Sequence, residues 1–224
     1  MILLGIDTAF DACSAAIVSG DDVLWAERRI IGKGHSEVLP PMVAAGLNSS
    51  GVGPAAITRI GVVIGPGAFA GVRVGLAFAR AFRIGHEADV AGVTSTQALA
   101  ASLSHHEGAT AVIFDARRGQ VYAALYGEDG EAIVPPFVAA PEAAAARLSA
   151  GAEGRRLRLA GSGAGLVEIN RPYTVDPAIW ADPAAIAALA ARRPAAAVLP
   201  QPLYLRPPDA APAAATLFSG LDAS

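Results

Sequence analysis

The order of apolar runs repeats in the two halves of this 224-residue chain, and this repeat limits its fold more than any other feature. Three runs bounded by turn residues open the first half: 2–6, 13–18 and 23–30. Three more open the second half: 110–114, 120–126 and a third that continues through Val134. Such runs predict strands. The first strand of each half ends in an aspartate, Asp7 or Asp115, so the pattern indicates a duplicated unit.

Helices and strands alternate after each opening, which predicts an α/β architecture. The helical patterns run from Ser36 or Glu37 to about Asn48, over 71–84, 95–102 and 141–149, and onward from Pro183. Further strands are predicted at 60–64, 89–93 and 157–160. We therefore expect an N-terminal lobe at 1–106, a shorter C-terminal lobe at 107–206, and a proline- and alanine-rich tail at 207–224 with no assigned motif.

The composition indicates a folded protein outside the membrane. Hydrophobic residues make up 53% of the chain and charged residues 17%, which favours a buried core. Apolar runs are shorter than a bilayer span, and the start of the chain lacks a basic region, so we expect a cytoplasmic location and no membrane. The net charge of −3 shows no basic excess for nucleic acid. The single cysteine, Cys13, excludes an internal disulfide.

A glycine-rich turn, Gly65-Pro66-Gly67, leads from a buried strand into the predicted helix 71–84. The turn lacks the Gly-Lys-Ser/Thr ending of a P-loop, so a tight structural turn is favoured over an anion site. The helix has two sides that favour packing. One side is a stripe of small residues, Gly71, Gly75 and Ala79. The other is an apolar face formed by Val74, Phe78 and Ala81. Periodicity leaves open whether the extra side packs within the chain or against a partner.

The two aspartate turns, at Asp7-Thr8 and Asp115, would face each other across a cleft in a duplicated fold. A nucleotide could bind there, with a metal held by aspartate. The second turn, however, carries Arg117 and Arg118 where a phosphate-cradling loop leaves space open. We therefore expect a weakened or lost nucleotide site at Asp7, Thr8 and Asp115. The four histidines lack the spacing of metal ligands, so no metal site is predicted.

Several ordered motifs along the chain resemble those of the TsaB family, formerly called YeaZ. They are Ile6-Asp7-Thr8, His35-Ser36-Glu37, Gly65-Pro66-Gly67, the stretch from Gly71 to Ala77, Thr94-Ser95, the stretch from Asp115 to Tyr122, and Tyr204-Leu205-Arg206. The chain departs from the family pattern at Ala68 and Ala70, where the family often has hydroxyl residues in the glycine-rich turn.

The resemblance implies an actin-like, Hsp70-type (ASKHA) fold with two ribonuclease-H-like lobes. TsaB-like proteins are non-catalytic paralogues of TsaD, and act with it in making N6-threonylcarbamoyladenosine (t6A) in tRNA. The resemblance thus implies an accessory subunit that binds and stabilises TsaD, with TsaE in the larger complex. It implies no enzyme activity and no cofactor of its own, and leaves ATP or ADP with magnesium possible only in the assembled complex. It leaves a homodimer and any tRNA contact open.

The resemblance also favours the partner alternative for the extra helix side. The corresponding interface positions are Glu37, Leu39, Met42 and Val43 on one helix and Arg73, Leu76 and Arg80 on the other. Two other hypotheses compete with the accessory role. One is an independent ATP-dependent phosphotransferase of the same fold, with Asp7 positioning a metal. The other is a metallopeptidase, for which the sequence offers no ligand set.

Overall fold

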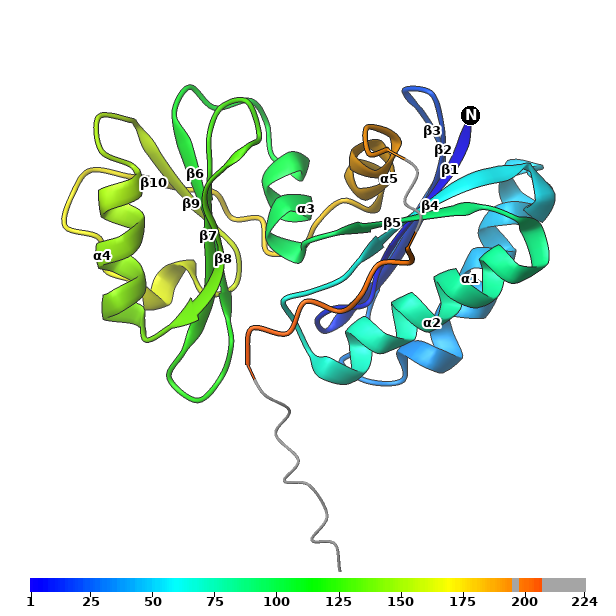
Figure 1. The fold of residues 1–224 in the computed structure, drawn as a ribbon, viewed down its shortest axis with the longest axis horizontal. Coiled ribbons are helices and arrows are strands. Elements are labelled where there is room, and N and C mark those ends of the chain that lie inside the picture. Colours follow the sequence, from blue (N-terminus) through cyan, green and yellow to red (C-terminus); the bar gives the residue numbers. More distant parts are fainter. Residues whose placement is uncertain (195–197, 207–224) are drawn as a thin grey trace, which may run out of the picture.

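Two five-stranded sheets stand side by side in the computed structural model, which describes residues 1–194 and 198–206 (Figure 1). The first sheet has the order β3-β2-β1-β4-β5, with bounds Ile2–Asp7 for β1, Ala12–Ser19 for β2, Asp22–Ile30 for β3, Ile57–Val63 for β4 and Asp89–Val93 for β5. The second has the order β10-β9-β6-β7-β8, with bounds Ala109–Asp115 for β6, Val121–Tyr126 for β7, Ala132–Ala139 for β8, Leu157–Ala160 for β9 and Thr174–Val175 for β10.

The predicted duplication is confirmed by the pairing of the strands. In the first sheet β1 pairs antiparallel with β2 and parallel with β4. In the second sheet β6 pairs antiparallel with β7 and parallel with β9, so β6 occupies the place of β1. Each lobe thus opens with an antiparallel meander and continues with parallel strands. This is the two-lobe α/β architecture of the actin-like fold.

The predicted helices are present, with ends shifted by a few residues. They are α1 (His35–Ser50), α2 (Phe69–His86), α3 (Ser95–Ser102), α4 (Pro141–Gly151) and α5 (Pro183–Ala191), with short 3₁₀ turns at Pro54–Ala56 and Ala164–Leu166. The third strand of the second lobe continues past Val134 to Ala139 despite Pro135 and Pro136. β8 is an edge strand, where proline's missing N–H removes no ladder bond that the sheet needs.

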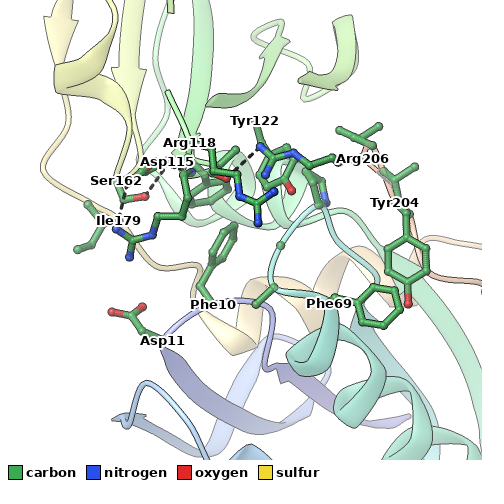
Figure 2. Close-up of a pocket in the computed structure, with 18 of the residues that line it drawn as sticks. Phe10, Asp11, Phe69, Asp115, Arg118, Tyr122, Ser162, Ile179, Tyr204 and Arg206 are labelled. Carbon is green, nitrogen blue, oxygen red and sulfur yellow. Dashed lines mark hydrogen bonds and ion pairs between the residues drawn. The ribbon is translucent and has the colours of Figure 1, made fainter. Parts of the chain in front are cut away.

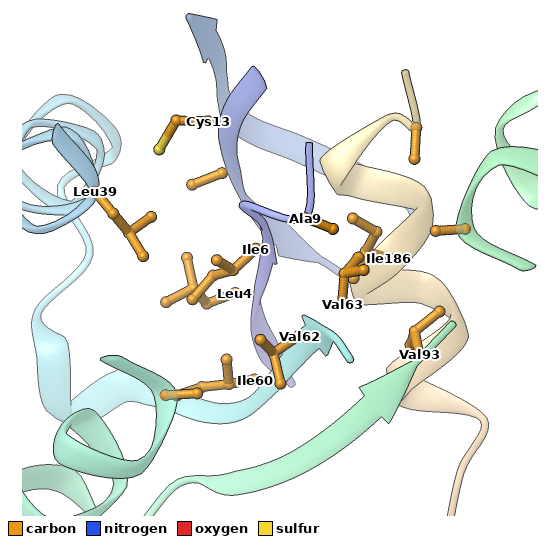
Figure 3. Close-up of a cluster of buried hydrophobic side chains, with 14 of the residues drawn as sticks. Leu4, Ile6, Ala9, Cys13, Leu39, Ile60, Val62, Val63, Val93 and Ile186 are labelled. Carbon is orange, nitrogen blue, oxygen red and sulfur yellow. The ribbon is translucent and has the colours of Figure 1, made fainter. Parts of the chain in front are cut away.

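The helices form layers on the sheets (Figure 1). α1 and α2 lie side by side on one face of the first sheet, and α5 covers the other face. α4 packs on the outer face of the second sheet, while α3 lies between the two sheets. Buried branched side chains fill the first lobe between its sheet and helices (Figure 3): Leu4, Ile6, Ile60, Val62 and Ile186.

The position of α5 corrects the predicted lobe boundaries. The chain passes from one sheet to the other between α3 and β6, near residue 106 as predicted. However, α5 lies within 107–206 and packs against β1 and β4 of the first lobe. Gly5 and Gly61 permit this contact, because a Cβ on Gly61 would lie 2.6 Å from the Ile186 carbonyl oxygen and one on Gly5 would overlap that of Pro183. Strand glycines therefore bring a late helix back to the first sheet.

Residues 198–206, hereafter the return segment, also belong with the first lobe for most of their length. The Leu203 amide donates to the Ile64 carbonyl at 2.7 Å, and the Arg80 guanidinium donates to the Pro200 carbonyl at 2.9 Å. At its end Arg206 donates to the Ala116 carbonyl of the second lobe at 3.1 Å. The return segment therefore connects the two lobes. The predicted tail at 207–224 lies outside the described residues.

Within residues 1–194 and 198–206, no helix combines the length and the apolar character that crossing a membrane requires.

Candidate functional site

A cleft of about 600 Å³ opens between the lobes (Figure 2). The turns after β1 and β6 face each other across it, as the duplicated pattern predicts. Aromatic and charged side chains dominate its lining: Phe10, Asp11, Phe69, Phe114, Asp115, Arg117, Arg118, Tyr122, Trp180, Tyr204 and Arg206. The cleft therefore combines planar surfaces with an excess of guanidinium groups.

Two phenylalanines bring the lobes together between these turns. Phe10 follows β1 and Phe114 lies near the end of β6, and their ring centroids are 4.5 Å apart. Phe114 is buried and Phe10 is partly buried against the core. This contact occupies part of the space between the two turns, where the duplicated pattern suggested a phosphate.

Of the three predicted nucleotide residues, Asp115 lines the cleft, whereas Asp7 and Thr8 lie outside its described lining. The buried Thr8 hydroxyl donates to the Gly71 carbonyl of α2 at 2.8 Å. Asp7 accepts the Ala9 amide at 2.8 Å. Burial raises the pKa of Asp7 to about 6, while the Ala9 hydrogen bond and the charge of Arg28 act in the opposite direction. Both residues thus serve the junction of β1 and α2.

Asp115 is engaged by the turn that follows it. Its Oδ1 accepts the Arg117 amide at 2.7 Å, and its Oδ2 lies 3.2 Å from an Arg117 guanidinium nitrogen. The Asp115 amide in turn donates to the Ser162 hydroxyl at 3.2 Å, from the glycine-rich turn after β9. This carboxylate therefore pairs with a neighbouring cation at the rim of the cleft.

The turn from Ala116 to Gln120 has an unusual backbone. Arg117 and Arg118 have φ values of 61° and 56°, the left-handed region that favours glycine. The Gln120 amide donates to the Arg117 carbonyl at 3.1 Å, and Arg206 donates to Gln120 Oε1 at 2.7 Å. Sequence reasoning missed this role of Arg206, although the Tyr204-Leu205-Arg206 motif marked its position.

The glycine-rich turn before α2 makes hydrogen bonds within the chain and also lines the cleft, through Pro66, Gly67 and Ala68. The Ala68 amide donates to the Ala9 carbonyl at 2.7 Å, and the Ser95 hydroxyl donates to the Pro66 carbonyl at 2.6 Å. A Cβ on Gly67 would lie 2.9 Å from the Ala9 side chain. These polar groups are thus used within the chain and hold α2 against the turn after β1.

Metal-ligating side chains do not gather in the part of the chain that the structure describes, where no three His, Cys, Asp or Glu residues are placed to hold an ion. Cys13 is fully buried, and burial raises the pKa of its thiol to about 11, consistent with an inert core thiol.

The predicted partner surface requires a correction. Four of its side chains are at most 2% exposed and belong to the core of the first lobe: Leu39, Met42, Val43 and Leu76. The stripe of small residues on α2 also faces inward, because a Cβ on Gly75 would lie 2.7 Å from the Thr8 hydroxyl. The sides of α1 and α2 assigned to a partner therefore pack on their own sheet.

The three charged residues of the predicted surface are exposed or half-buried. Glu37 and Arg73 are exposed and Arg80 is half-buried. The Arg73 guanidinium donates to the Tyr204 hydroxyl at 2.9 Å and lies 3.7 Å above the Phe69 ring centroid. The outward residues of the two helices, hereafter the α1/α2 face, are Glu37, Pro40, Pro41, Ala44, Ala45 and Asn48 of α1 with Ala70, Arg73, Ala77, Ala81 and Ile84 of α2.

Comparison with known proteins connects this geometry to a family. A family model described as "TsaD: tRNA N6-adenosine threonylcarbamoyltransferase" matches residues 29–206. The TsaB proteins of Bacillus subtilis and Escherichia coli are 36% and 34% identical, over 56% and 62% of this chain. These matches span 55% and 64% of the two relatives' own lengths.

A crystal structure described as an uncharacterized protein with similarity to peptidase YEAZ from Pseudomonas aeruginosa has a TM-score of 0.79 and 28% identity. The similarity covers 92% of this chain and 99% of that one, so both lobes share the arrangement. The sequence motifs, the duplicated sheets and these relatives all indicate the same family. The chain belongs to the TsaB (YeaZ) family, a branch of the family that the TsaD model describes.

Proposed function

We propose that this protein is a non-catalytic subunit in t6A biosynthesis, and that it binds and stabilises TsaD through the α1/α2 face. The observation that carries the proposal is the composition of that face. It is rich in alanine, and its most exposed large apolar side chain, Ile84, is 86% accessible. A face of small side chains beside one accessible isoleucine suits close packing against a partner helix.

The geometry of the α1/α2 face suits helical partners. α1 and α2 lie side by side, so their outward sides form one broad surface (Figure 1). Ala44, Ala77 and Ala81 allow a partner helix to approach closely, because the distance between helix axes depends on the side chains at the contact. Glu37 and Arg73 supply charges of both signs beside this apolar area, which favour one orientation of the partner.

The arrangement of acidic groups supports placing catalysis in TsaD. Asp115 pairs with Arg117 at the rim of the cleft, and Asp7 accepts a backbone amide outside the cleft lining. Under this proposal, ATP or ADP with magnesium binds in the assembled complex, which TsaE joins. An independent phosphotransferase would need Asp7 to face a metal in the cleft. Magnesium-dependent ATP turnover by the isolated chain, lost in Asp7→Ala, would favour that alternative.

The test is size-exclusion chromatography with light scattering on this protein mixed with TsaD from the same organism. We expect a heterodimer, lost in Ala77→Glu and retained in the matched variant Ala146→Glu, because Ala77 lies on the α1/α2 face and the exposed Ala146 lies on α4. Circular dichroism checks that both variants fold. Separate elution of the wild-type proteins, or equal loss in both variants, would contradict the proposed binding.

A further inference from the structure

We propose that the interlobe cleft binds single-stranded RNA, with backbone phosphates on Arg117 and Arg118 and an unpaired base against the aromatic rings of the cleft lining, among them Tyr122 and Trp180. The choice of RNA as the nucleic acid rests on the proposed function. Figure 2 shows Arg118, Tyr122 and Arg206 on one wall, opposite Phe10 and Asp11. Guanidinium groups next to aromatic rings are the usual means of holding single-stranded nucleic acid.

The charge of the cleft differs from that of the whole chain. The chain carries a net charge of −3, but three arginines and two aspartates line the cleft. Arg206 donates to two neutral oxygens, the Ala116 carbonyl and Gln120 Oε1. The Arg117 side chain is 86% exposed, whereas that of its partner Asp115 is 30% exposed. In this ion pair the cation is therefore nearer to solvent than the carboxylate, and the other cleft aspartate, the exposed Asp11, accepts the Trp180 indole N–H.

The shape of the cleft favours a strand over a free nucleotide. In the duplicated pattern, a free nucleotide would place its phosphates between the turns after β1 and β6. Phe10 and Phe114 meet at this place, and the Thr8 hydroxyl is bonded to Gly71. Arg117 and Arg118 lie on the turn after β6, at exposed positions on the rim of the cleft. A strand that crosses the rim reaches these arginines without separating Phe10 from Phe114.

The backbone of this turn is a second observation. Two bulky residues, Arg117 and Arg118, both adopt left-handed φ values at the cleft. Such conformations persist where neighbouring contacts hold them, and they gather at ligand sites. Here the Asp115 carboxylate and Arg206 supply the contacts. The chain therefore maintains an unfavourable backbone that puts two adjacent arginines at one rim.

Aromatic rings of the cleft offer planar surfaces for a base. Tyr122 and Trp180 line the cleft together with Phe10. The Trp180 indole donates to Asp11 Oδ1 at 2.9 Å, so its ring is held in place. Base stacking on such rings tolerates different sequences, because every base presents a planar face. We therefore expect weak sequence preference and strong dependence on salt.

The test is fluorescence anisotropy with the full chain and a labelled, unpaired RNA of about 12 nucleotides. We expect binding that the double variant Arg117→Ala/Arg118→Ala weakens at least about tenfold. Its slope of log affinity against log salt should fall by about 1.4, because each lost phosphate contact on a single strand contributes about 0.7. The matched control Arg155→Ala/Arg156→Ala removes the same charge from exposed positions outside the cleft lining and should bind like the wild type.

A second readout reports from the cleft itself. The chain has two tryptophans, and Trp25 contacts Gly46 of α1. In a Trp25→Phe background, we expect RNA to quench the emission of Trp180, and the arginine double variant to abolish this quenching.

Three results would overturn the proposal: no RNA binding by the wild type, equal weakening in the control variant, or displacement of the RNA by similar concentrations of ATP. The last would indicate a free-nucleotide site. The arginine double variant should still form the heterodimer with TsaD, since Arg117 and Arg118 lie outside the α1/α2 face. Failure of RNA binding is therefore distinct from failure of the proposed partner function.

Discussion

Asp7 and Asp115 end equivalent strands of the two lobes, yet their surroundings differ. Asp115 lies at the rim of the cleft and pairs with Arg117. Asp7 accepts the Ala9 amide, and burial raises its pKa to about 6. The same residue type at the same place in a duplicated unit thus has different hydrogen-bond and charge partners. At the scale of the residue, an equivalent position in the repeat therefore does not determine which groups a side chain contacts.

Asp7→Asn should change the pH dependence of stability. The pKa of Asp7 is raised from 3.8 to about 6 on folding, so the folded chain holds this proton more tightly than the unfolded chain. Protonation of Asp7 therefore contributes its full stabilisation to the folded wild type below about pH 4. This contribution to the free energy of unfolding is lost as the pH rises through 6. This loss is about 3 kcal/mol over the full range, at 1.36 kcal/mol per pKa unit.

Urea denaturation at pH 4 and pH 8 measures this effect. From pH 4 to pH 8, we expect the free energy of unfolding of the wild type to fall by about 2 to 3 kcal/mol relative to that of Asp7→Asn. A difference between the two proteins that is independent of pH would show that Asp7 titrates normally.

At the scale of the element, α2 shows how backbone contact selects the buried side of a helix. Its small residues lie against the end of β1, where a Cβ on Gly71 would overlap the Thr8 carbonyl oxygen. Leu76 is consequently buried, although periodicity also permitted an outward position. The outward residues Ala77 and Ala81 are left for other contacts. Close approach of one helix to its own sheet thus decides which residues a partner can reach.

Replacement of two glycines in α2 by alanine should have opposite effects. Gly71→Ala forces the helix away from Thr8 and should lower the free energy of unfolding by about 2 kcal/mol, as overpacked substitutions do. Gly85→Ala meets no atom within 4 Å and should raise it by about 0.5 to 1 kcal/mol, through better helix propensity.

Chemical denaturation of the two glycine variants beside the wild type gives the comparison. Equal effects would mean that the contact between Gly71 and Thr8 does not limit the packing of α2.

At the scale of the whole molecule, the return segment joins features that are far apart in the sequence. Tyr204 stacks on Phe69 at the start of α2, with ring centroids 4.8 Å apart. Two residues later, Arg206 bonds the turn that carries Arg117 and Arg118. The α1/α2 face and the cleft rim therefore share one structural connection. A partner that displaces Arg73 from Tyr204 would remove one of the contacts that hold the return segment to α2.

Arg206→Ala should loosen the second-lobe turn without unfolding the chain. The variant loses hydrogen bonds to the Ala116 carbonyl and to Gln120 Oε1, each contributing about 1 kcal/mol. We expect the hydrogen-exchange protection of the Gln120 amide to fall about tenfold or more, since 1.4 kcal/mol corresponds to a factor of ten.

Gln201→Ala is the control for this experiment, because Gln201 is exposed and its side chain bonds Leu199 within the return segment. Unchanged protection of Gln120 in Arg206→Ala would show that the turn holds its left-handed backbone without the return segment.

The sequence by itself determined the duplication, the family and the order of the helices and strands, apart from the two-residue strand β10, which it did not predict. These features depend on local patterns: apolar periodicity, turn residues, and motifs such as Gly65-Pro66-Gly67. It also placed Asp7 and Asp115 at the ends of matching strands, and the turns after these strands do face each other in the structure. Local patterns suffice here, because apolar periodicity and turn residues mark strands and helices within short windows of sequence.

The tertiary structure alone decided which side of each helix is buried, how α5 returns to the first sheet, and why Arg206 lies at the cleft. α2 has apolar or small residues on several sides, so periodicity permitted more than one buried side. The close contacts of Gly71 and Gly75 with Thr8 determine which side of α2 is buried. Arg206 reaches Ala116 across 90 residues of sequence. Such contacts follow from the packing of whole elements, which no local pattern encodes.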